Sequence, residues 1–212
     1  MTEQFVHEYL EKIGEKWKKK GIAIELGCWL GASAYALLKG LKKAGYSNRP
    51  MPFYCYDYWK ANEDQIPKAE AAGLKLVINQ DILPLFLKNV HPVHNAIVPY
   101  QGQIEDMLQY YTGYPIEFCI FDAPKCNPTF DITIRKLCKY WIPGVTILGL
   151  LDYYFYEKFE IGSVNRERFK TPVYFMERNQ ENFIKIKEWP GKSSCVFFLY
   201  SPKNIKSIKI YL

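Results

Sequence analysis

Residues 21–33 read GIAIELGCWLGAS, and this stretch decides the fold. An apolar run ends at the acid Glu25, two glycines follow four residues apart, and a helix is predicted over residues 32–44. Such a run is typical of a buried parallel strand, and Gly27 permits a tight turn with close backbone approach. A turn of this kind at the carboxyl end of a first strand is where doubly wound α/β proteins hold nucleotide-like cofactors.

The spacing of the two glycines narrows the kind of cofactor. The pattern G-x-x-x-G, made by Gly27 and Gly31, differs from the G-x-G-x-x-G of dinucleotide binders and from the phosphate-binding P-loop. The turn has no lysine to hold phosphates, and Glu25 would repel a pyrophosphate but suits a cationic ligand. We expect Gly31 to let the helix begin against the strand without a clashing side chain.

Composition indicates one enzyme-sized domain, residues 1–212. We divide it into an N-terminal helix (1–20), a cofactor-binding core (21–151), and a substrate-side segment with a closing hairpin (152–212). No apolar stretch reaches the length of about 18 residues that spans a bilayer, and the N-terminus does not resemble a signal peptide. The six cysteines are scattered through apolar runs, so reduced thiols and a cytoplasmic location are expected. Only His7, His91 and His94 could supply imidazole, so no zinc site is expected.

The net charge of +6 comes largely from lysine clusters at residues 18–20, 39–43 and 203–209. The first two clusters belong to predicted helical segments, where they would form solvated faces or helix ends. Nucleic-acid binding would require exposed aromatics among the basic residues, whereas the aromatic residues here lie mainly inside predicted strands. Neither nucleic acid nor a membrane is therefore expected as a partner.

Strand and helix patterns alternate along the chain. Strands are predicted at residues 22–26, 53–56, 96–100, 117–121, 145–151, 183–188 and 195–200; helices at 5–19, 32–44, 66–73, 81–90, 104–111, 129–141 and 166–178. The fold class is therefore α/β: a Rossmann-like, doubly wound, seven-stranded sheet, mostly parallel. Pro190-Gly191 predicts the turn of a C-terminal antiparallel hairpin.

Four acids lie at or just past the carboxyl ends of predicted strands: Glu25, Asp57, Asp122 and Asp152. A single acid there could simply cap the next helix, but four in the same topological place favour a ligand site. Asp57 is the natural partner for ribose hydroxyls, because a carboxylate can accept two hydrogen bonds from a vicinal diol.

The motif E-L-G-x-x-x-G-x-S of residues 25–33 resembles motif I of class I S-adenosylmethionine-dependent methyltransferases. It also resembles the corresponding motif of the catechol and caffeoyl-coenzyme A type O-methyltransferases and of the macrolide and aminocoumarin sugar O-methyltransferases. The resemblance implies S-adenosylmethionine as cofactor, with Ser33 and nearby amides holding its methionine portion and Asp57 its ribose. The implied cofactor-binding residues are Glu25, Gly27, Cys28, Gly31, Ser33, Asp57, Tyr58, Gly102, Gln103 and Asp122.

The segment FDAPK, residues 121–125, resembles the D-x-x-[KH] of the same families, in which the acid binds magnesium and the Lys or His is the general base. The resemblance thus implies Asp122 and Asp152 as ligands of Mg²⁺, and Lys125, or Asp152 acting through a water, as the catalytic base. The families end the fifth strand with two acids or an acid and an amide, whereas Asp152 here stands between Leu151 and Tyr153. Whether a metal is required is left open.

Two further segments are candidates for recognition. Residues 153–156 and 159–170 are rich in aromatic side chains, which could stack on an acceptor or only support a loop. Trp59 could pack on the adenosine or only cover the core. His91 and His94 are expected to be structural, because they precede the third strand at the edge away from the site.

The sequence thus predicts a methyltransferase that O-methylates a small-molecule hydroxyl, on a sugar or another secondary metabolite. One alternative is a non-catalytic cofactor-binding or scaffold protein, which the missing second acid favours. Another is a nicotinamide-dependent oxidoreductase, which the missing third glycine disfavours. A homodimer is compatible with the fold, but no interface is located.

Overall fold

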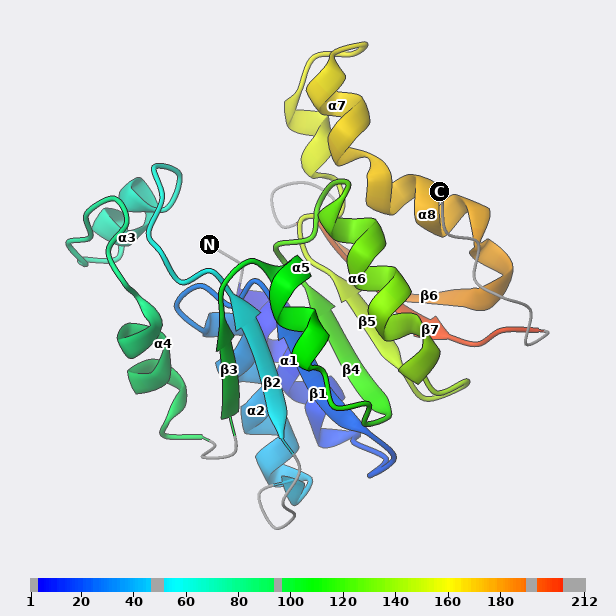
Figure 1. Cartoon of the computed structure of the whole chain (residues 1–212). Coiled ribbons are helices and arrows are strands. Elements are labelled where there is room, and N and C mark those ends of the chain that lie inside the picture. The colour runs from blue at the N-terminus through cyan, green and yellow to red at the C-terminus, as the bar shows by residue number, and fades with distance from the viewer. Residues whose placement is uncertain (1–3, 47–51, 94–96, 190–193, 204–212) are drawn as a thin grey trace.

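The computed structural model describes residues 4–46, 52–93, 97–189 and 194–203, and it contains a seven-stranded sheet (Figure 1). The strands are β1 (Ile22–Leu26), β2 (Phe53–Asp57), β3 (Ile97–Gln101), β4 (Ile116–Phe121), β5 (Ile147–Leu150), β6 (Phe183–Trp189) and β7 (Cys195–Tyr200). Their order is β3-β2-β1-β4-β5-β7-β6; the first five strands are parallel, and β7 runs antiparallel to both β5 and β6. The predicted sheet is confirmed. The turn predicted at residues 190–191 lies outside the described residues.

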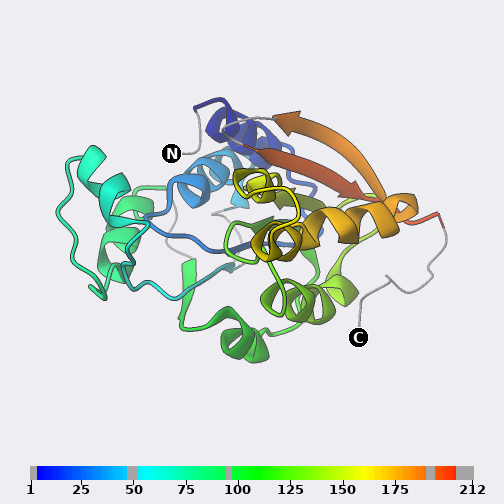
Figure 2. The same ribbon diagram turned by 90° about the horizontal axis from the view of Figure 1, so that it is seen from above.

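Helices cover both faces of the sheet (Figure 2). One face carries α1 (Gln4–Glu15), α2 (Ala32–Lys43) and α4 (Leu83–Val90); the other carries α5 (Ile104–Met107), α6 (Thr129–Leu137) and α8 (Thr171–Arg178). Two short helices, α3 (Ile66–Ala71) and α7 (Val164–Phe169), extend beyond the carboxyl ends of the strands (Figure 1). Four 3-10 turns complete the described helices: η2 (Leu108–Tyr110), η3 (Cys138–Tyr140), η4 (Phe155–Lys158) and η5 (Gln180–Asn182).

The alternation of side chains along β1 determines where its acid points. Ile22, Ile24 and Leu26 belong to the core under α5 and α6. Ala23 belongs to the opposite core, under α1 and α2. Glu25 shares the face of Ala23 because successive side chains of a strand alternate, so its carboxyl group points beneath α2.

The first helix is shorter than predicted and ends at Glu15 rather than at residue 19. The chain leaves the helix because the buried carboxylate of Glu117, on β4, accepts hydrogen bonds from the backbone N–H groups of residues 18, 20 and 21. Trp17 is nevertheless buried, and its indole Nε1 donates to the carbonyl oxygen of Gly21 at 3.0 Å. A distant acid thus replaces the last helical turn.

The single helix predicted over residues 166–178 is wrong. The structure has two helices, α7 and α8, separated at Lys170. Pro172 lies in the first turn of α8, where its missing N–H costs no helical hydrogen bond. Ser163 caps α7 by accepting a hydrogen bond from the N–H of Arg166. The proline therefore begins a helix instead of bending one.

No helix within the described ranges is both long and apolar enough to cross a membrane. All six cysteines lie within those ranges and are free thiols.

We predict that Gly40→Ala destabilises the protein by about 2 kcal/mol or more, because the new side chain would be overpacked. A Cβ at residue 40 of α2 would lie 2.0 Å from the carbonyl oxygen of Glu11 on α1. Helix propensity alone would give the opposite sign, a gain of about 1 kcal/mol. Urea unfolding measures the change.

Gly73→Ala is the control for this prediction, since a Cβ there meets no atom within 4 Å. Its positive φ of +77° leaves only a backbone cost of about 1 kcal/mol. A Gly40→Ala variant as stable as the parent would contradict the close contact between α1 and α2.

Candidate functional site

The turn after β1 depends on two glycines with positive φ. At Gly27, φ is +89° and a Cβ would lie 2.4 Å from the backbone nitrogen of Ala123, so the turn after β1 touches the turn after β4. At Gly31, φ is +87° and a Cβ would lie 2.8 Å from Cγ1 of Val90 and 2.9 Å from Cδ2 of Phe86. Gly31 therefore allows α2 to begin against α4, rather than against the strand as expected.

Asp57 ends β2 with its carboxylate facing the same turn. Oδ2 accepts a hydrogen bond from the N–H of Trp29 at 2.8 Å, and Oδ1 accepts one from the N–H of Trp59 at 2.6 Å. Burial raises the pKa of Asp57, while the backbone N–H groups oppose this shift. The N–H groups of Cys28 and Tyr58 also hydrogen-bond to the carboxylate and lower its pKa.

A cavity of about 310 Å³ opens beside Asp57 at the carboxyl ends of β2 and β3. It is lined by Asp57, Tyr58, Lys60, Ala61, Asn62, Gln65, Asn79, Gly102, Gln103, Ile104, Glu105, Ala123 and Thr129. The structure thus brings together four of the expected cofactor-binding residues: Asp57, Tyr58, Gly102 and Gln103.

Sequence reasoning missed the polar side chains on the far wall of this cavity. Lys60, Asn62, Gln65 and Asn79 come from the segment between β2 and α4, which is folded back by an isolated β-bridge between residues 60 and 81. The local sequence pattern does not predict that these side chains line a cavity, because the bridge that brings them there pairs residues about twenty positions apart.

Trp59 covers the core and does not face the cavity. Its side chain is fully buried, its ring lies 4.9 Å from that of Phe86, and its Nε1 donates to the carbonyl oxygen of Trp29. His91 is exposed at the end of α4, before β3 begins, and so lies away from the cavity. His94 lies outside the described residues.

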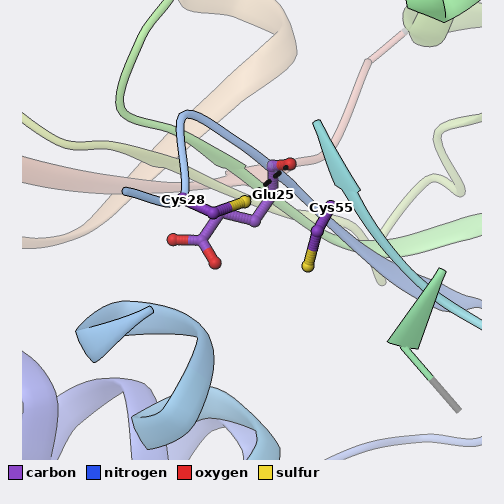
Figure 3. Close-up of side chains that lie close together, drawn as sticks. All are labelled: Glu25, Cys28 and Cys55. Atoms are coloured by element: carbon purple, nitrogen blue, oxygen red, sulfur yellow. Dashed lines mark hydrogen bonds between the residues drawn. The ribbon is translucent and has the colours of Figure 1, made fainter. Parts of the chain in front are cut away.

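Glu25, Cys28 and Cys55 form a buried polar cluster under the turn (Figure 3). Burial raises the pKa of Glu25 to about 8, although a hydrogen bond from the hydroxyl of Ser33 to Oε1 opposes the shift. The other oxygen, Oε2, has no hydrogen-bond partner among the described residues. Ser33 is itself buried and is occupied by Glu25, so these two expected cofactor residues contact each other.

The donor atoms of this cluster lie within 4.8 Å of one another, as metal ligands would. However, burial raises the pKa of both thiols as well as that of Glu25, so all three groups are protonated at neutral pH. The thiol of Cys28 points toward the carbonyl oxygens of Glu25 and Tyr56 and away from the cavity. Cys28 can therefore offer a ligand only its backbone, and we assign no metal here.

Asp122, Lys125 and Asp152 form a second polar group, after β4 and β5. The ammonium nitrogen of Lys125 lies 2.5 Å from Oδ2 of Asp152 and 3.6 Å from Oδ1 of Asp122. Burial alone would lower the pKa of Lys125, but the two carboxylates together raise it. Burial raises the pKa of Asp122, and the charge of Lys125 opposes this.

The expected magnesium ligands do not fit that ion. Mg²⁺ prefers six oxygen ligands in near-octahedral geometry, and Asp122 and Asp152 already hold an ammonium group between them. The next residue, Tyr153, is buried against Phe198 and offers no ligand to the site.

Aromatic rings border this second group on the side of α7. The ring of Phe155 lies 5.2 Å from the ammonium nitrogen of Lys125 and 4.4 Å from that of Lys158. The next residue, Tyr156, contacts the guanidinium of Arg166 at 5.1 Å. Of the predicted acceptor segment, Phe155 thus lies beside the charged group and Tyr156 contacts α7, whereas Tyr153 belongs to the core.

By sequence, the chain matches no family model and none of the curated proteins. By structure, it is similar to the O-methyltransferase NovP, with a TM-score of 0.63, 12% identity, and coverage of 93% of this chain and 78% of NovP. An O-methyltransferase from Bacillus cereus, solved with SAH, gives a TM-score of 0.59 at 13% identity, covering 95% of this chain and 83% of that one. This chain shares the fold of these O-methyltransferases.

A third structure with this fold is CalS11, a TDP-rhamnose 3'-O-methyltransferase, with a TM-score of 0.56 and 10% identity over 92% of this chain and 77% of CalS11. In this fold, the cavity beside Asp57 and the charged group around Lys125 both lie at the carboxyl ends of the parallel strands, the edge at which such sheets bind ligands. The likeness covers nearly the whole chain, so the resemblance seen in motif I extends to the complete fold.

Proposed function

We propose that the protein is an S-adenosylmethionine-dependent methyltransferase that methylates a hydroxyl group of a small molecule. The observation that carries the proposal is Asp57 at the wall of the 310 Å³ cavity, where its carboxylate can accept hydrogen bonds from ribose hydroxyls.

The residues take distinct roles in this proposal. Asp57, Tyr58, Gly102 and Gln103 hold the adenosine portion, and the turn from Gly27 to Gly31 provides backbone contacts. The bound cofactor would supply an already activated methyl group, so the protein mainly has to align the acceptor and manage one proton. Asp152, directly or through a water, accepts the proton of the acceptor hydroxyl.

Lys125 is poorly suited to the role of base. Its side chain is bound to two carboxylates that raise its pKa, which keeps it as an ammonium group at neutral pH. Of the two candidate bases, we therefore favour Asp152. The acceptor would enter beside Phe155 and Tyr156, in the segment 152–212 that we propose as the substrate side of a single domain.

The acceptor class also belongs to the proposal. CalS11 acts on a sugar nucleotide, as its name states, and the present chain shares its fold. A sugar or other secondary metabolite is the acceptor class we propose. The cytoplasmic location and the homodimer remain predictions.

Calorimetric titration with S-adenosylhomocysteine, using NADH as control and repeating each run with magnesium, tests the cofactor. We expect micromolar binding of S-adenosylhomocysteine, no binding of NADH, and no gain from magnesium. A preference for NADH would replace the proposal with an oxidoreductase.

The scaffold alternative makes a different prediction. A non-catalytic protein would bind S-adenosylhomocysteine but transfer no methyl group to any member of a broad panel of sugars and phenols. A methylated product detected by mass spectrometry would exclude it, whereas no binding under any condition would refute the methyltransferase proposal.

A further inference from the structure

The ammonium group of Lys125 lies between Asp122 and Asp152, the two acids that the motif resemblance implied as Mg²⁺ ligands. It contacts Asp152 at 2.5 Å and Asp122 at 3.6 Å, and these two acids come from the turns after β4 and β5. The three side chains are only a quarter to a third exposed. The lysine therefore forms an ion-paired bridge between two strand ends.

The donor set explains why a lysine can stay there. Two carboxylates compensate one ammonium charge and leave one negative charge over. They supply only two ligand side chains, whereas a magnesium ion takes six oxygen ligands from protein, substrate and water together. A lysine ammonium has three N–H donors, so after binding two acids it keeps one donor for another group. The ring of Phe155, 5.2 Å from the nitrogen, adds a cation–π contact that also favours the ammonium.

We propose that Lys125 takes the place of the divalent cation, so that the protein holds and orients its acceptor hydroxyl without a metal. The inference rests on the proposed methyl transfer for its role, but the bridge can be tested without catalysis. The third N–H of Lys125 donates to the acceptor oxygen, and Asp152, held beside that oxygen by the same lysine, receives its proton.

The affinity of Asp122 and Asp152 for a divalent cation distinguishes a lysine bridge from a metal site. If Lys125 occupies the cation position, the native protein has no room for a metal between the two acids. Removing the charge of Lys125 without much change in side-chain length leaves two neighbouring carboxylates uncompensated, and such a pair attracts a divalent cation.

The experiment is a titration of the full chain with Mn²⁺, followed by the electron paramagnetic resonance signal of the free ion. We expect no binding at this site by the native protein and at least tenfold stronger binding by Lys125→Met. The double variant Lys125→Met/Asp152→Asn should lose the gained affinity. Thermal unfolding confirms that each variant is folded, and Lys125→Gln replaces Lys125→Met if the latter is not.

Lys158→Met is the matched control, because Lys158 lies over the same Phe155 ring but forms no ion pair with any described residue. It should bind Mn²⁺ no better than the native protein. Two results would overturn the proposal: stoichiometric Mn²⁺ binding by the native protein that Asp122→Asn abolishes, or no gain of binding in any folded Lys125 variant. Neither result depends on cofactor binding, so the bridge and the methyltransferase proposal can fail separately.

Discussion

Replacing Asp57 by alanine is expected to weaken S-adenosylhomocysteine binding by more than tenfold, a loss above about 1.4 kcal/mol. The carboxylate lines the cavity, where it can accept hydrogen bonds from ribose hydroxyls in addition to those from backbone N–H groups such as Trp29 and Trp59. Hydrogen bonds to a charged acceptor are worth about 1.5–3 kcal/mol each, so the loss of two ribose contacts accounts for the effect. Titration calorimetry measures it.

Asp131→Ala is the matched control. Asp131 lies on α6, and burial raises the pKa of its carboxyl group as it does for Asp57. Asp131 is absent from the cavity lining, so its loss should leave the affinity within about twofold, or roughly 0.4 kcal/mol. Equal affinities of the native protein and a folded Asp57→Ala variant would remove the main support for the proposed cofactor site.

Glu25→Gln is expected to stabilise the ligand-free protein at alkaline pH. The pKa of Glu25 rises from 4.5 to about 8 in the folded state, mainly because of burial. Stability from its neutral form is therefore fully present below pH 4.5 and is lost as the pH rises through 8. Because each unit of pKa difference is worth about 1.4 kcal/mol, the native protein should lose on the order of 4 kcal/mol between pH 5 and 9. Glutamine, which cannot ionise, should avoid this loss.

Urea unfolding at pH 5, 7 and 9 measures the effect. Glu117→Gln is the control, because Glu117 is also a buried acid with a raised pKa, but its carboxylate accepts backbone hydrogen bonds from residues 18, 20 and 21. A glutamine has one acceptor oxygen, so this variant should be destabilised at every pH. A Glu25→Gln protein with the same pH dependence as the native one would show that Glu25 does not titrate in this range.

Much of the proposed site follows from local pattern. The apolar run before Gly27, the glycine spacing and the acid at residue 57 predict a parallel strand, a tight turn and a carboxylate at one sheet edge, and the structure has all three. These features are short-range: strand periodicity and the conformational freedom of glycine act within a few residues.

The errors arise where distant residues decide the outcome. The first helix ends early because Glu117, about one hundred residues away, binds the backbone that would have continued it. The cavity's far wall was not predicted, because the β-bridge between Lys60 and Asp81 brings it into place. Helix propensity and motif spacing contain no information on such contacts.

The sequence by itself determined the α/β alternation, the order of strands and turns along the chain, and the presence of acids at the carboxyl ends of the strands. Only the tertiary structure decided that Glu25 is buried under α2 while Asp57 faces a cavity, and that Lys125 joins Asp122 to Asp152. The physical reason is that the protonation and availability of a charged group depend on its burial and on the charges beside it. Burial and neighbouring charges both depend on contacts between residues that are brought together only when the sheet is assembled.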